Sequence, residues 1–106
     1  MAITTADIQA LADRIAKEFH PLRIILFGSR AAGTAREDSD VDLLVLLPFS
    51  GTPYRKALEI LNKVDPRFGV DLIVRDPADA QARYGFGDPL IREAFDRGRV
   101  LYEAAA

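Results

Sequence analysis

The sequence contains no cysteine and only one histidine, His20. The missing thiols exclude disulfide bonds, thiolate metal sites and a cysteine nucleophile, and they fit a reducing compartment. His20 directly precedes Pro21 at the expected end of a helix, where a structural role is the simpler interpretation. A zinc site or a Ser-His-Asp triad is therefore not expected.

Long hydrophobic runs and an excess of positive charge are also missing. The apolar run from Ile24 to Phe27 is far too short to cross a membrane, and the early stretch carries Asp7 and Asp13 where a signal peptide would be apolar. The net charge of -2 gives no basic footprint, so no direct nucleic-acid binding is expected. These absences predict a cytoplasmic protein with no membrane contact.

The composition is that of a folded globular protein. Apolar residues make up 49% of the 106 residues and charged residues 28%, and no internal repeat or low-complexity segment is present. A chain of this length supports one modest hydrophobic core. We therefore expect a single domain over residues 1–106.

Hydrophobic periodicity predicts alternating helices and strands. Apolar residues at helical spacing predict helices over 5–20, 54–64, 78–84 and 89–97, and β-branched runs predict strands over 22–27, 41–47, 70–74 and 100–102. The first two strands are joined by a loop and should pair antiparallel, whereas helix 54–64 suggests a parallel crossover. The expected class is α/β (α+β), a small mixed β-sheet with helices packed mainly on one face.

Acidic residues interrupt two of the predicted strands. Asp40 and Asp42 in SDVDLLV share one face of a strand, and Val41 points the other way, into a core. Mg²⁺ takes oxygen ligands and is commonly held by carboxylates together with substrate phosphates. If the third strand pairs beside the second, Asp71 can join them around two metal ions, which can activate a hydroxyl and stabilise a leaving phosphate. Each acid alone also fits a solvent-facing position, but three acids in two apolar strands favour a site.

A Gly-Ser turn precedes these acids. Gly28 lets the backbone approach a ligand, and Ser29 supplies a hydroxyl at the start of a possible helical turn, where phosphate oxygens are favoured. A plain strand-to-helix turn with a serine cap is the alternative. Arg30 can pair with phosphate or with one of the acids. The turn matches neither the P-loop pattern nor the dinucleotide fingerprint.

The stretch GSRAAGTAREDSDVDLLV resembles the signature of the nucleotidyltransferase superfamily that includes DNA polymerase β and kanamycin nucleotidyltransferase. More closely, it is similar to the minimal nucleotidyltransferases, as are the order of elements, the acid in the third strand and the ending IREAFDRGRVLYE. The resemblance implies transfer of a nucleoside monophosphate from ATP or another NTP, with release of pyrophosphate. One departure is Ala32, where many relatives carry a second arginine.

The resemblance also implies roles for the residues singled out above. Gly28 and Ser29 would hold the triphosphate, with Arg30 beside them. Asp40 and Asp42 would bind Mg²⁺, and Asp71 would complete the site and help to activate the incoming hydroxyl.

The resemblance further implies a partner. Minimal nucleotidyltransferases often pair with a small all-helical toxin RNase of the HEPN family and act as antitoxins, and some transfer AMP to a tyrosine of the toxin. The alternative is a non-catalytic antitoxin that neutralises a toxin by protein-protein binding, which the departure at Ala32 favours. The intact acids favour the enzyme, because binding alone would not require three costly carboxylates on one face. A free-standing enzyme acting on small molecules is disfavoured because the chain has no substrate domain.

Overall fold

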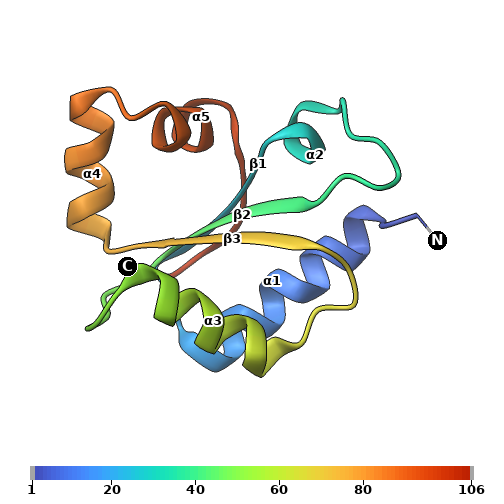
Figure 1. Ribbon diagram of the computed structural model, residues 1–106, viewed down its shortest axis with the longest axis horizontal. Coiled ribbons are helices and arrows are strands. Elements are labelled where there is room, and N and C mark those ends of the chain that lie inside the picture. Colours follow the sequence, from blue (N-terminus) through green and yellow to red (C-terminus); the bar gives the residue numbers. More distant parts are fainter. Residues whose placement is uncertain (1, 106) are drawn as a thin grey trace.

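A four-stranded mixed sheet with the strand order β3-β2-β1-β4 forms the centre of the protein (Figure 1). The structure is a computed structural model and describes residues 2–105. In chain order the elements are α1 (Thr5–Phe19), β1 (Arg23–Phe27), α2 (Ser29–Ala32), β2 (Val41–Leu46), α3 (Pro53–Val64), β3 (Val70–Arg75), α4 (Pro77–Phe86), α5 (Pro89–Arg97) and β4 (Arg99–Glu103).

The strand pairing follows the expected pattern. β1 is antiparallel to both β2 and β4, and β2 is parallel to β3 through the crossover helix α3. The mixed α+β sheet is thus confirmed, and the possible helical turn at Ser29 is present as α2. The helix placed at 78–84 is longer than expected and spans Pro77–Phe86.

Helices cover both faces of the sheet, whereas the sequence suggested mainly one. The larger core cluster joins α1 and α3 to alternate residues of β2, among them Val41, Leu43 and Val45. The other residues of the same strand, Leu44 and Leu46, pack with α4 and α5 on the opposite face. In Figure 1 these two helix pairs lie below and above the sheet. The longest helices do share one face, but the second face has a core of its own.

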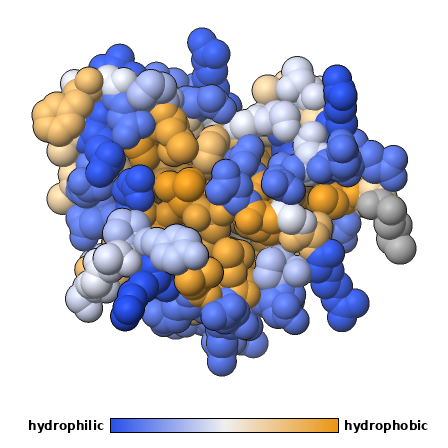
Figure 2. All heavy atoms as spheres, in the orientation of Figure 1, coloured by the Kyte–Doolittle hydropathy of each residue, from blue (hydrophilic) through white to orange (hydrophobic). Residues whose placement is uncertain are grey.

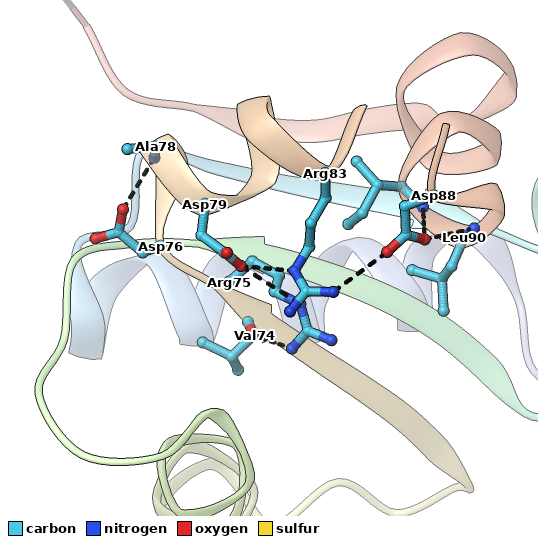
Figure 3. A network of polar contacts seen from close by, with 9 residues as sticks. Val74, Arg75, Asp76, Ala78, Asp79, Arg83, Asp88 and Leu90 are labelled. Carbon is cyan, nitrogen blue, oxygen red and sulfur yellow. Dashed lines mark hydrogen bonds and ion pairs between the residues drawn. The ribbon is translucent and has the colours of Figure 1, made fainter. Parts of the chain in front are cut away.

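A chain of ion pairs joins β3, α4 and the start of α5 (Figure 3). The Asp79 carboxylate lies 2.8 Å from Nε of Arg83 and 3.9 Å from Nε of Arg75. Arg83 reaches on to Asp88 at 3.4 Å, and Asp88 caps α5 by accepting hydrogen bonds from the backbone amides of Leu90 and Ile91. An aspartate that binds free amide groups stabilises a helix start. The network therefore links the start of α5 to α4 and to the end of β3.

Within residues 2–105, no helix combines the length and apolar character needed to span a membrane.

Candidate active site

Asp42 and Asp71 are direct partners in the parallel pairing of β2 with β3. Residues in register on neighbouring strands project their side chains to the same face of the sheet. For this pair it is the face covered by α4 and α5, because Leu44 and Ile73, two residues further along each strand, pack there. Asp40 precedes β2 and has the same parity as Asp42. The two strands thus bring the three predicted acids to one end of one face.

Two glycines lie against the first two acids. A Cβ atom on Gly28 would overlap Oδ2 of Asp42, and a Cβ atom on Gly69 would overlap Oδ1 of Asp40. Gly28 also has φ 75° and ψ -157°, a conformation almost confined to glycine. The backbone of Gly28 therefore lies directly against the acid cluster. Gly69 was not singled out from the sequence.

A fourth acid, Glu93, faces this cluster from α5. Its Oε2 accepts a hydrogen bond from the backbone amide of Gly28 at 3.0 Å. Sequence reasoning missed Glu93 because nothing in the helical stretch IREAFDR marks it, and only the packing of α5 on the sheet brings it here. Its position makes α5 a wall of the site.

Asp42 is partly buried among the other three acids, and its pKa is shifted as a result. Partial burial raises the pKa of Asp42 above its usual value, and the negative charges of Asp71, Asp40 and Glu93 raise it further. Both effects disfavour the ionised carboxylate. The ionised cluster is therefore a place where a cation would be stabilised.

Arg30 is bonded to the loop that precedes the acids. Its Nε and Nη2 donate to the carbonyl oxygen of Ser39 at 3.2 and 2.7 Å, and Nη2 also donates to the carbonyl oxygens of Arg36 and Glu37. These bonds hold the loop that leads into Asp40. Arg30 thus braces the loop before Asp40, and its contact with phosphate stays a prediction.

Two hollows adjoin the acids. One, of about 330 Å³, is lined by Gly28, Ser29, Ala32, Thr34, Glu93 and Arg97. The other is a groove of about 550 Å³ between α3 and β3, lined by Asp71 and by apolar residues that include Tyr54 and Leu58. Apolar side chains gather over β3 and α3 on the face shown in Figure 2. The cluster therefore has a polar hollow on one side and an apolar groove on the other.

The donor set fits Mg²⁺ in its chemistry. The predicted ligands are all carboxylates, which suit a hard cation, and the charge crowding at Asp42 would be relieved by one. As placed, no three such side chains among residues 2–105 converge tightly enough to enclose a metal ion. Asp40 and Asp71 are exposed, so their carboxylates can rotate toward Asp42 without disturbing the core.

The comparison with known families agrees with this geometry. A family model described as "Nucleotidyltransferase domain" matches residues 8–101, which is most of the chain. The protein belongs to this nucleotidyltransferase family, and the resemblance carried by the Gly-Ser and Asp-Val-Asp motifs is confirmed. Among curated proteins, none matches the sequence.

Solved structures share the fold. A Sulfolobus solfataricus protein described as a nucleotidyltransferase is 24% identical, with a TM-score of 0.58 over 73% of this chain and 70% of that chain. A chain of a toxin-antitoxin structure with AMP-PNP is 20% identical, with a TM-score of 0.56 over 91% of this chain and 73% of that chain. A chain of the toxin-antitoxin MntA-HepT is 16% identical, with a TM-score of 0.50 over 95% of this chain and 74% of that chain. At these identities the likeness establishes the common fold.

Proposed function

We propose that this protein is a Mg²⁺-dependent nucleotidyltransferase that transfers AMP from ATP to a hydroxyl group of a helical HEPN-type toxin and so acts as its antitoxin. The observation that carries the proposal is the register of Asp42 with Asp71 next to the Gly28 turn. This arrangement places oxygen ligands beside a backbone turn that a phosphate can approach closely. Family membership supports the reaction class.

In this proposal the nucleotide lies with its phosphates against Gly28 and Ser29, and Asp40, Asp42 and Asp71 hold two Mg²⁺ ions. Ions held there would neutralise charge on the phosphates and on the attacking oxygen. Support for ATP as the donor comes from the similar toxin-antitoxin structure with AMP-PNP, an ATP analogue in which an imido group replaces the oxygen between the β- and γ-phosphorus atoms.

The reaction exchanges one phosphorus-oxygen bond for another. The acceptor oxygen bonds to the α-phosphorus of ATP, and the bond from that phosphorus to the pyrophosphate oxygen breaks. Pyrophosphate leaves with the bonding electrons, and the hydroxyl proton passes to a base, for which the candidate is Asp71, exposed on the edge strand β3. The acceptor ends as a nucleotidyl ester.

A protein is the acceptor that suits the groove beside Asp71. The groove is lined by apolar side chains, and the Tyr54 side chain is exposed at its edge. Such a surface fits a macromolecule better than a small polar metabolite. The similar toxin-antitoxin structures support a toxin as this partner. A helical toxin and a tyrosine hydroxyl as the modified group are what the family resemblance implies.

The test is the intact mass of the toxin partner, taken as the helical protein encoded beside this chain, after co-expression with wild type or Asp42→Asn. We expect one or more added AMP units with wild type only. An unmodified partner that still co-purifies with both forms would overturn the enzymatic proposal and favour an antitoxin that acts by binding. Replacement of Asp38, an exposed loop aspartate, by asparagine is the matched control and should leave the modification intact.

A further inference from the structure

The hollow beside Gly28 and Ser29 needs a positive side chain if it is to hold phosphates. Two acids, Asp42 and Glu93, already lie at its border. A polyphosphate adds several negative charges to this place, and the resulting repulsion must be offset by cations. Arg30 cannot serve without giving up its two hydrogen bonds to the carbonyl oxygen of Ser39.

One arginine does line this hollow, and it comes from the other end of the chain. Arg97 stands in the last turn of α5 and lines the hollow together with Ala32 of α2. It is exposed, and within residues 2–105 it makes no hydrogen bond or ion pair. An arginine held at the rim of a polar hollow without a partner is available to a ligand.

We propose that Arg97 binds the phosphate groups of the nucleotide in the hollow lined by Gly28, Ser29 and Ala32. The planar guanidinium group matches two phosphate oxygens at once, which a lysine cannot do. This inference rests on the proposed function and adds a phosphate-binding residue to it. The small side chain of Ala32 leaves the hollow open, and Arg97 supplies from α5 the positive charge that α2 lacks there.

The neighbouring acid does not cancel this role. Glu93 precedes Arg97 by one helical turn and lines the same hollow, but its carboxylate is engaged by the Gly28 amide. Arg97 is the only basic side chain among the described residues that line the hollow, and Glu93 forms no ion pair with it. On α5, Glu93 therefore holds the Gly28 turn, and Arg97 lines the hollow beside that turn.

The experiment compares ATP binding in the presence of Mg²⁺ by calorimetry for wild type, Arg97→Gln and Arg99→Gln. Arg99 is also exposed and lies two residues further on, but it borders a different hollow, so it controls for the loss of one positive charge. We expect Arg97→Gln to weaken ATP binding about 10-fold or more, the range of one charge-assisted contact, and Arg99→Gln to change it less than about 2-fold. Equal binding by wild type and Arg97→Gln, or equal losses in both variants, would overturn the role of Arg97.

A second variant tests the location of the effect. Ala32→Arg, introduced together with Arg97→Gln, returns a guanidinium group to the same hollow from α2 instead of α5. We expect this double variant to recover part of the affinity for ATP that Arg97→Gln loses. We also expect inorganic triphosphate to compete with ATP in wild type and in the double variant, but weakly in Arg97→Gln. A double variant no better than Arg97→Gln would place the effect outside the hollow and overturn the assignment. Failure of the wild type to bind ATP would instead refute the proposed function itself.

Discussion

Glu93 accepts a hydrogen bond from the backbone amide of Gly28, and this 3.0 Å contact joins the last helix to the turn after the first strand. The contact spans 65 residues of sequence. It also places a fourth negative charge near Asp42, whose pKa is raised by burial and by the acids around it. α5 is therefore an electrostatic part of the candidate site as well as a cover for the sheet.

Replacing Glu93 by glutamine should lower the pKa of Asp42 toward its usual value. The change removes one of the charges that raise it, while the amide oxygen can still accept the Gly28 hydrogen bond. The measurement is a carboxyl-detected NMR pH titration of metal-free protein. Glu59→Gln on α3 is the control, because Glu59 pairs with Lys56 and has no part in the Asp42 titration. The same change in both variants would show that Glu93 does not act on Asp42 directly.

Replacing Asp42 by asparagine should stabilise the metal-free protein at neutral pH. Because the pKa of Asp42 is higher in the folded than in the unfolded chain, the folded state binds more protons between the two values and loses stability as pH rises through them. Asparagine cannot ionise, so its advantage in Tm should be largest at pH 7 and shrink below about pH 4, near the unfolded value. Thermal unfolding across this pH range, with Asp38→Asn as control, is the measurement. A Tm difference that does not vary with pH would contradict the mechanism.

Gly69→Ala should impair the site while leaving the fold in place. The new methyl group would overlap the carboxylate of Asp40 and force that flexible side chain to move. We expect the stabilisation of the protein by Mg²⁺ and ATP, seen as a rise in Tm, to be reduced. Gly85→Ala is the matched control, since a Cβ atom there meets nothing within 4 Å and alanine is the better helix former. An undiminished ligand shift in Gly69→Ala would remove Asp40 from the site.

Gly98→Ala should destabilise the protein by about 1–3 kcal/mol or more, the usual cost of forcing atoms into a packed core. A methyl group at this position would overlap the carbonyl oxygens of Ala94 and Leu26 and the side chain of Ile25, and the two carbonyls belong to backbone that cannot yield easily. Urea unfolding is the measurement, again compared with Gly85→Ala. An equal free energy of unfolding in the two variants would show that α5 can shift away from β1 at no cost.

The strand pattern and the acid motif were predictable because both are local. Carboxylates inside apolar runs mark positions that a plain strand would not favour, and the crossover helix α3 fixes β2 and β3 as parallel neighbours. The position of Glu93 and the contact of Gly69 with Asp40 were not predictable from the sequence. Both depend on how α5 and the loop before β3 pack in three dimensions.

The sequence of β2 indicates the second helical layer. β2 is apolar at both parities, with Leu43 and Val45 on one face and Leu44 and Leu46 on the other. A strand that is apolar on both sides is typical of a sheet covered on both faces. The run therefore indicates helices on both sides, as the structure has them.

The pairing of β1 with β4 has a consequence for synthesis on the ribosome. β1 is made early, but its neighbour β4 and the helix α5 that covers Ile25 and Phe27 come from residues 89–103. Until that segment has emerged, β1 can pair with β2 only, and a nascent chain exposes the other edge of β1 and the apolar side chains that α5 later covers. Such a surface favours association with chaperones or with other chains. The Gly28 turn also stays without its Glu93 contact until then. The site that we propose for ATP is thus completed only late in translation.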